Sequence, residues 1–426
     1  MVILVLIGSF LILLLLGCSL GFAMGISTLL YMILFDGTAL IMLAQRLTEG
    51  VYSFPLLAIP YFILAGVLMN HFGITDRIFT FARTLVGHIT GGLGHVNVLA
   101  SMMFAGMSGS ALADAGGLGA VEIRAMREAG YSKRFSAAIT ASSSCIGPII
   151  PPSIIMIVYA VLAEVSVADM FAGGIIPGIL MGLTLMVTIY IMAKFNIETC
   201  PKDSKSTMKK VLKAFKGAIL PLMTPMILVS GILFGVFTPT EGGAIAILYT
   251  IVVGIYYKTF TLKVLLNSMI ETIKTSAQVL FFMASASAFL WVLTIEHVPS
   301  IIVNSLLSLS ENKFIILFLL VIALMVIGMF MAIDAALILL VPVLLALAEA
   351  LSLDLVHVGV FVIVALMIGL ISPPVGPALF IVSSIAKIEY GELAKASLPF
   401  IIPLIVVVFL VAYIPALVTF LPSIIP

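Results

Sequence analysis

Serine hydroxyls and prolines gather in one stretch of an otherwise apolar region, residues 142–153 (SSSCIGPIIPPS). A proline lacks the backbone N–H and costs about 3 kcal/mol inside a helix, so a helix is predicted to open here. Inside a membrane, the freed carbonyls are tolerated only within protein or beside a water-filled cavity. With the serine hydroxyls, such carbonyls would supply the oxygen ligands of a sodium ion. The second half of the opened helix would direct its positive N-terminus towards an anionic substrate.

This stretch has a counterpart later in the chain, residues 369–377 (GLISPPVGP), with fewer hydroxyl groups. A shift of 222 residues aligns glycines and prolines of the two halves: Gly106 with Gly328, Gly147 with Gly369, Pro151-Pro152 with Pro373-Pro374, and Pro177 with Pro399. Simple proline kinks are the alternative, but they do not account for two Pro-Pro pairs at matching positions. Duplicated halves with matching Gly/Pro interruptions point to the binding site of a secondary transporter. The pattern leaves open whether the repeats are parallel or inverted.

Two apolar regions, 96–128 and 328–351, are interrupted by glycine or polar residues and are predicted to be re-entrant helical hairpins. The predicted tip of the first is residues 106–110 (GMSGS), because glycine permits positive φ and serine presents an oxygen atom. Close helix packing through small residues is an alternative that is compatible with such a tip. The second tip, residues 328–332 (GMFMA), lacks the Gly/Ser pattern.

Asp334 lies in the apolar run 329–345. A charge at the bilayer centre costs about 2.5–3.5 kcal/mol on insertion scales, so this acid is a candidate ion ligand, proton site or partner for substrate hydroxyls. The alternative is a helix cap, which fits Asp114 better because residues 115–117 (AGG) follow it. Glu241 is interpreted as structural, in the first turn of a helix capped by Thr240.

The composition requires lipid as the main solvent. Of 426 residues, 63% are hydrophobic and only 9% are charged, whereas soluble proteins carry about a quarter charged residues. Apolar runs of about 20 residues, enough to cross about 30 Å of hydrocarbon, follow one another along the chain. The net charge of +1 suggests no nucleic-acid partner, and the three cysteines and five histidines show no metal-ligand spacing. Because no phosphate loop or nucleophile–base pair is visible either, the chain is not expected to be an enzyme.

The apolar runs predict an all-α polytopic membrane protein. Helices are expected at 2–35 (broken near Gly17 or Gly21, and retained rather than cleaved as a signal peptide), 55–70, 76–92, 135–147, 153–165, 170–195, 218–236, 242–257, 277–293, 313–327, 356–370 and 397–420. Residues 258–274 are predicted to form a separate helix lying in the interface. A basic loop, 196–217, is expected in the cytoplasm and divides a first repeat, 1–195, from a second, 218–426.

Several runs of sequence together resemble the large membrane subunit of tripartite ATP-independent periplasmic (TRAP) transporters. They are residues 106–111, the Gly130-Tyr131 pair with 137–143, residues 149–153, the run 237–241 and the run 369–377. The resemblance covers essentially the whole chain. It implies an inverted repeat and an elevator mechanism, in which two hairpins and two broken helices slide past a scaffold in the bacterial inner membrane. No cofactor is implied other than sodium as the coupling ion.

By position, the resemblance nominates residues for both ligands. The sodium ligands would be Ser108, Gly109, Ser110, Ser144, Cys145, Gly147 and Pro148 in the first half, and Gly328, Gly369 and Ser372 in the second. Asp334 is a further candidate in the second half, and Ser108, Ser153 and Asp334 would contact the substrate.

The resemblance also implies partners: a small membrane subunit and a periplasmic substrate-binding protein, both as separate chains. The substrate would be a small carboxylate, such as a sialic acid, another sugar acid or a C4-dicarboxylate. The main alternative is a stand-alone sodium/carboxylate or gluconate-type symporter, which would work without a binding protein. A channel is a second alternative and predicts conductance without coupling.

Overall fold

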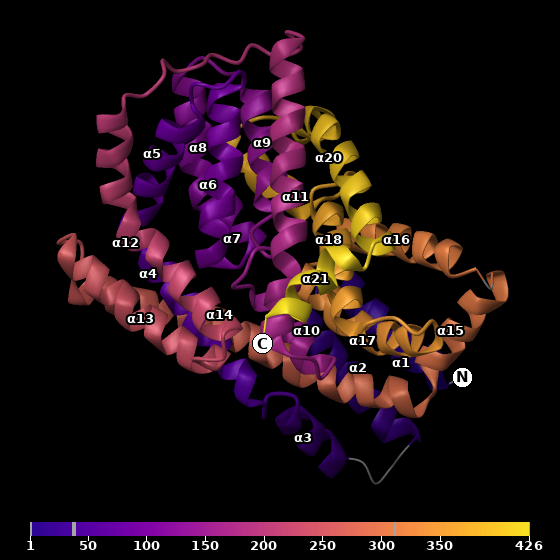
Figure 1. The fold of residues 1–426 in the computed structure, drawn as a ribbon. Coiled ribbons are helices and arrows are strands. Elements are labelled where there is room, and N and C mark those ends of the chain that lie inside the picture. The colour runs from indigo at the N-terminus through magenta and orange to yellow at the C-terminus, as the bar shows by residue number, and fades with distance from the viewer. Residues whose placement is uncertain (1, 36–39, 311, 426) are drawn as a thin grey trace.

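The structure, a computed structural model, describes residues 2–35, 40–310 and 312–425, and every regular element in these ranges is helical (Figure 1). Eight segments are long and apolar enough to cross a membrane: Phe54–His71, Val167–Lys194, Met208–Leu233, Pro239–Tyr256, Leu262–Ile295, Lys313–Phe330, Ile333–Ala350 and Tyr390–Tyr413. The predicted all-α polytopic fold is confirmed.

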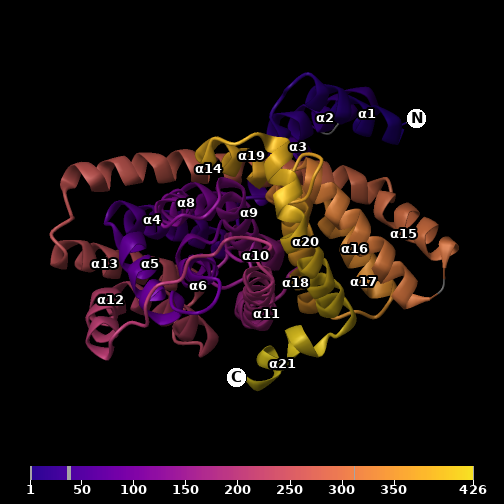
Figure 2. The same cartoon turned by 90° about the horizontal axis from the view of Figure 1, so that it is seen from above.

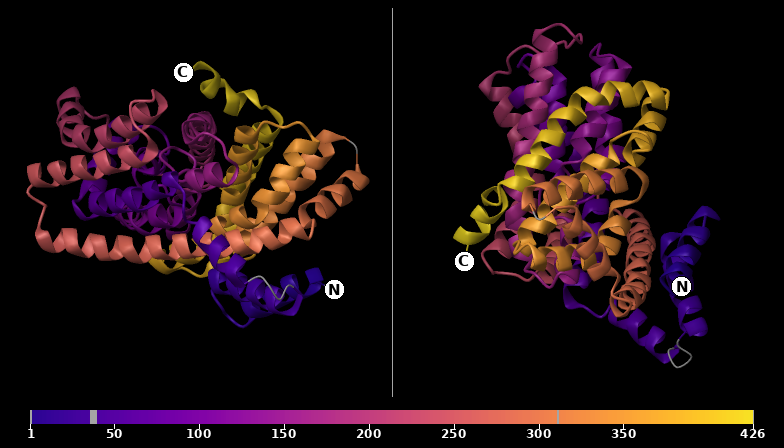
Figure 3. Two further views of the ribbon diagram at one scale, coloured as in Figure 1. Left: turned by 90° about the horizontal axis from the view of Figure 1, so that it is seen from below. Right: turned by 90° about the vertical axis from the view of Figure 1, so that its right-hand side faces the viewer.

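The first apolar run is two helices, α1 (Val2–Leu15) and α2 (Leu20–Phe35), and the predicted break is found at Gly17, whose φ is +81°. α1, α2 and α3 (Leu40–Glu49) lie at the edge of the molecule, outside the long helix α14 (Leu262–Ile295) (Figure 3).

α14 runs along one side of the molecule (Figure 2) and packs against α2, α3 and α4 (Ala58–His71). The prediction of a separate interfacial helix at 258–274 is therefore wrong. No glycine or proline interrupts residues 262–295, so the charged and apolar parts form one helix.

The first half continues through an amphipathic helix, a hairpin and a broken helix. Its elements are η1 (Phe54–Leu57), α5 (Ile74–Val86), α6 (Gly92–Ser108), α7 (Ala111–Gly116), α8 (Leu118–Glu128), α9 (Lys133–Ser144), α10 (Ile154–Leu162) and α11 (Val167–Lys194). The first tip is shorter than predicted, because α6 continues through Gly106 to Ser108 and the chain reverses at Gly109, whose φ is +57°. The predicted break in residues 142–153 is confirmed, since α9 ends at Ser144 and α10 begins at Ile154.

The second half repeats the order of hairpin, broken helix and long helix. They are α12 (Met208–Leu233), α13 (Pro239–Tyr256), α14, α15 (Val298–Leu309), α16 (Lys313–Phe330), α17 (Ile333–Ala350), α18 (Leu355–Leu370), α19 (Pro377–Ala386), α20 (Tyr390–Tyr413) and α21 (Ala416–Ile424). α18 is buried from His357 to Leu370 and forms the centre of the molecule. α13 begins with a capping box of Thr238 and Glu241, so Thr240 is not the cap. Pro239 takes the first helical position, and the capping residue therefore precedes it.

Two predicted segments of the second half have different bounds in the structure. The hairpin is α16 and α17, so the helix expected at 313–327 is its first arm, and the chain turns at Met331 and Ala332 rather than at Gly328. Gly328 lies inside α16, where its missing side chain admits α18. The helix expected at 397–420 is α20 followed by α21, and the two are separated at Pro415.

The 222-residue shift also relates the helices. It takes the starts of α6, α7, α9, α10 and α11 (92, 111, 133, 154 and 167) to 314, 333, 355, 376 and 389, and α16 to α20 begin at 313, 333, 355, 377 and 390. Five elements thus correspond within one residue. The pairing of Gly/Pro landmarks in the sequence reflects a repeated order of hairpin, broken helix and long helix.

Candidate functional site

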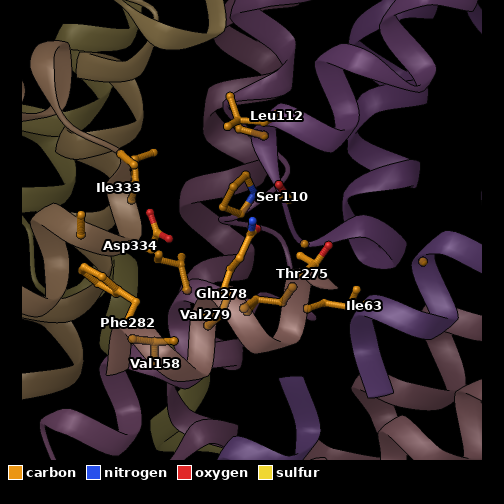
Figure 4. A pocket seen from close by; sticks show the side chains of 18 of the residues that line it. Ile63, Ser110, Leu112, Val158, Thr275, Gln278, Val279, Phe282, Ile333 and Asp334 are labelled. Atoms are coloured by element: carbon orange, nitrogen blue, oxygen red, sulfur yellow. The ribbon is translucent and has the colours of Figure 1, made fainter. Parts of the chain in front are cut away.

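A cavity of about 1120 Å³ lies where the two hairpin tips and the two broken helices meet α4 and α14. One wall carries Gly109, Ser110, Pro148 and Asp334, from both halves of the chain. Figure 4 shows the carboxylate of Asp334 and the amide of Gln278 extending into the same space, with Ser110 beside them. The cavity therefore combines residues predicted for sodium and for substrate with a second wall that was not predicted.

The first broken helix is held open by Ser153. This serine is the N-cap of α10, where its Oγ accepts a hydrogen bond from Met156 N (3.3 Å) and donates one to Pro148 O (2.6 Å). Its side chain is buried, and the next residue, Ile154, lines the cavity. The predicted contact between Ser153 and substrate stays a prediction, while the structure gives this hydroxyl a capping role.

The first hairpin tip rests directly on the first break. A β-carbon built on Gly147 would lie 3.6 Å from the carbonyl carbon and oxygen of Ser110, and one on Gly109 would lie 3.0 Å from Pro152 O. Ser144 is buried, and its Oγ donates to Ala141 O (2.9 Å). Hydroxyl and carbonyl oxygens of the tip and the break thus share one small region. Ser108 ends α6, but its side chain lies outside the described residues.

The second hairpin meets the second break through backbone. A β-carbon built on Gly369 would lie 2.8 Å from Gly328 Cα, and Gly376 N donates to Met329 O (3.1 Å). Ser372 is buried beside them, with its Oγ donating to Ile368 O (2.7 Å). The predicted residues Gly328, Gly369 and Ser372 are therefore brought together. Because this contact is made by backbone atoms, the second tip does not need a Gly/Ser-rich sequence.

The two halves interlock around the site. Cys145 Sγ, at the end of α9, donates to Met367 O of α18 (3.2 Å). In addition, α10 packs against α17, and α19 packs against α7, so each half-helix contacts the hairpin of the other repeat. This exchange of contacts ties both hairpins and both broken helices into one packed body.

Asp334 combines the two roles weighed from the sequence. It is the second residue of α17 and so lies in the first turn of the helix, where an acid is favoured by the helix dipole. It also lines the cavity and is only partly buried. The carboxylate thus lies at a helix N-terminus with one side open to the cavity.

The opposite wall, formed by α4 and α14, is partly apolar but carries polar side chains that were not singled out from the sequence. Glu271, Thr275 and Gln278 succeed one another at intervals of four and three residues, which places them on one face of α14. Across from them, His71 of α4 approaches Glu271, with Nε2 and Oε2 separated by 3.6 Å. This helical spacing of polar residues in a long apolar helix is a signal that could have identified the wall.

Comparisons with known proteins agree on one family. The family model described as "Tripartite ATP-independent periplasmic transporter, DctM component" matches residues 7–417. The chain is 42% identical over 409 residues to the sialic acid TRAP transporter large permease protein SiaM of Vibrio cholerae, covering 96% of this chain and 95% of that protein. It is 36% identical to the C4-dicarboxylate TRAP transporter large permease protein DctM of Pseudomonas aeruginosa, covering 94% of each.

Among solved structures, the YdaH transporter of Alcanivorax borkumensis is similar, with a TM-score of 0.68 over 89% of each chain. Its sequence identity is 15%, so this likeness concerns the fold alone.

Proposed function

Because the chain belongs to the DctM family of TRAP transporters, whose large permeases are bacterial inner-membrane proteins, we propose that it performs sodium-coupled uptake of a small organic acid anion. The observation that carries this proposal is the cavity between the packed body of hairpins and broken helices and the wall of α4 and α14. Sialic acid is the first substrate to test, since the 42% identical relative is named for it.

The sodium part of the proposal rests on the donor set. Sodium is a hard cation, and hard cations take oxygen ligands from hydroxyl and carbonyl groups. Such oxygens converge where Ser110 meets Ser144 and Gly147, and again where Gly328 meets Gly369 and Ser372. A cation bound there would hold each hairpin tip against its broken helix. The other nominated ligands, Ser108, Gly109, Cys145 and Pro148, lie in the same first region.

The substrate part rests on the ends of two half-helices. Ile154 and Pro377, the first residues of α10 and α19, both line the cavity, so both half-helices begin at its wall. A substrate carboxylate would be attracted to these ends. Asp334 and Gln278, on opposite walls, would then bind hydroxyl or amide groups of the same molecule.

An elevator movement fits the way the chain is divided. The interlocked body of α6–α10 and α16–α19 would carry the site, and α14 with α4 would form the fixed wall along which it slides. A small membrane subunit would brace the fixed part, and a periplasmic binding protein would deliver substrate as the third component. A stand-alone symporter would share this geometry but would not require the third component.

The test is uptake of labelled sialic acid into proteoliposomes that contain this chain with its small subunit. Three conditions are compared: an inward sodium gradient with the binding protein, the same gradient without it, and potassium in place of sodium. Accumulation only in the first condition supports the proposal. Equal accumulation without the binding protein would favour the stand-alone symporter, and equilibration without accumulation in all three would indicate a channel.

A further inference from the structure

The cavity is lined by acidic side chains without matching basic ones. Among the lining residues that the structure describes, two are acids, Asp334 of α17 and Glu271 of α14, and none is a lysine or an arginine. His71 is the one side chain of that lining that can become positive. Asp114, the other acid weighed from the sequence, lies within α7 and does not line the cavity, so the helix cap suggested for it is not formed. An anionic substrate therefore meets no permanently positive side chain in this cavity.

Glu271 is open to a ligand. Its side chain is 58% exposed and lines the cavity. Its one ion-pair contact within the described ranges is His71, and the separation of 3.6 Å between Oε2 and Nε2 is too long for a hydrogen bond. Lys274, one turn along α14, neither lines the cavity nor forms an ion pair with Glu271. The negative carboxylate of Glu271 thus has oxygen atoms free to accept hydrogen bonds from a substrate.

The groups beside Glu271 are polar but neutral. Thr275 and Gln278 lie on the same face of α14, and the seven residues from Glu271 to Gln278 cover about 10 Å along the helix. Gln278 extends towards Ser110 from the wall that also carries Thr275 (Figure 4). Asn70 of α4 adds a second amide to the lining. Such a row can bind several hydroxyl or amide groups of one substrate.

A second carboxylate on the substrate would be disfavoured at this row. The proposed function places one substrate carboxylate at the starts of α10 and α19, and sodium at the hairpin tips, both across the cavity from α14. A carboxylate that reached α14 would be repelled by Glu271 and would find no lysine or arginine to pair with. A hydroxyl or an amide N–H at the same place would instead donate a charge-assisted hydrogen bond to Glu271.

We propose that Glu271 is a specificity-determining residue: it favours substrates with one carboxylate and several hydroxyl or amide groups, and it rejects dicarboxylates. This inference rests on the proposed function, because it requires that the transported acid binds in this cavity. It assigns part of the choice of substrate to the fixed wall of α14, in addition to the hairpins and broken helices that would move.

The experiment measures substrate binding as a rise in melting temperature of the purified full chain with its small subunit, in sodium buffer. The binding protein is left out because it would impose a selectivity of its own. Gluconate and glucarate are the matched probes, since they differ only in whether the far end carries a hydroxyl or a second carboxylate. Sialic acid is the larger probe with one carboxylate. Wild type should bind gluconate and sialic acid at least about tenfold more tightly than glucarate.

Three variants locate the source of this preference. Glu271→Gln keeps the size of the side chain and removes its charge, so glucarate should bind at least about fivefold more tightly than to wild type, while gluconate binding stays equal or weakens. Glu271→Asp keeps the charge and should still reject glucarate. Glu128→Gln, on the exposed face of α8, is the matched control and should behave as wild type. Melting temperatures without ligand check that each variant is folded.

The inference is overturned if wild type binds glucarate as tightly as gluconate, or if Glu271→Gln keeps the wild-type preference. It is also overturned if neither gluconate nor sialic acid binds. Repeating the measurement in potassium separates these results from a failure of the proposed function. Equally tight binding in potassium would contradict sodium coupling, whereas a preference for gluconate that Glu271→Gln abolishes would support the role of Glu271 in either buffer.

Discussion

Gly328 of α16 and Gly369 of α18 face each other so closely that a β-carbon on Gly369 would lie 2.8 Å from Gly328 Cα. These two glycines were paired with Gly106 and Gly147 from the sequence alone, as landmarks of a repeat. Their contact joins the second hairpin to the second broken helix, just before α16 and α18 end near the cavity. A geometry that depends on two missing side chains is sensitive to the smallest substitution.

Gly369→Ala is expected to destabilise the protein by about 1–3 kcal/mol, because the new methyl group overlaps backbone atoms that cannot move independently. Melting temperature in detergent is the measurement, and uptake should fall with it. Gly391→Ala is the matched control, since no atom lies within 4 Å of a β-carbon built there. Equal melting temperatures for the two variants would contradict the close packing described here.

Asp334→Asn is expected to lower uptake at least about tenfold, equivalent to about 1.4 kcal/mol, because it removes the negative charge from the cavity wall and leaves the shape unchanged. The measurement is the initial rate of labelled substrate uptake at equal amounts of inserted protein. Glu349→Gln, at the exposed far end of α17, is the control and should transport normally. Wild-type uptake by a well-folded Asp334→Asn protein would remove this residue from the site.

Ser144→Ala is expected to raise the sodium concentration for half-maximal uptake about fivefold or more, as loss of one buried hydrogen-bonding or ligand group costs about 1–3 kcal/mol. The substrate concentration for half-maximal uptake, measured at saturating sodium, should change much less. Ser136→Ala provides the comparison, because Ser136 is equally buried on α9 but two turns away from the break. A sodium dependence that is unchanged in Ser144→Ala would contradict the proposed ion region.

The loop between the halves supplies a pH-dependent contact. Arg83 donates two hydrogen bonds to Asp203, of 2.7 and 3.0 Å, and these bonds lower the pKa of the Asp203 carboxyl. A lowered pKa in the folded state stabilises the protein above the unfolded value near 4, and that stabilisation is lost as pH falls through the folded value. Both side chains are more than a third exposed, so the contribution is expected to be below about 1 kcal/mol.

Asp203→Asn should therefore lower the melting temperature slightly at neutral pH. It should match the wild type in acid, once the pH has fallen through the lowered folded-state pKa and the wild-type carboxyl is also neutral. The measurement is melting temperature against pH for the two proteins. A difference that persists unchanged into acid would show that the ion pair is not its source.

The sequence predicted helix breaks best where proline rules out a continuous helix. Prolines at 148, 151 and 152 cannot continue a helix, and the structure breaks there. The second hairpin was misplaced because its turn, at Met331 and Ala332, contains neither glycine nor serine. Local propensity gives no signal at such a turn, which depends on packing against α18.

The cavity wall from α14 escaped prediction for a different reason. Thr275 and Gln278 are polar but uncharged, and a membrane helix tolerates such residues in many roles. The helical spacing of these residues marks one polar face of α14, but the position of α14 opposite Asp334, set by contacts between distant segments, shows that this face lines the cavity.

The most direct test of the central claim is simultaneous uptake of labelled sodium and labelled sialic acid in proteoliposomes that contain the chain, its small subunit and the binding protein. If sodium drives transport through this cavity, adding substrate should increase sodium entry. Asp334→Asn should then lower the substrate uptake and the substrate-dependent sodium entry together. Substrate accumulation without any accompanying sodium entry would contradict the account.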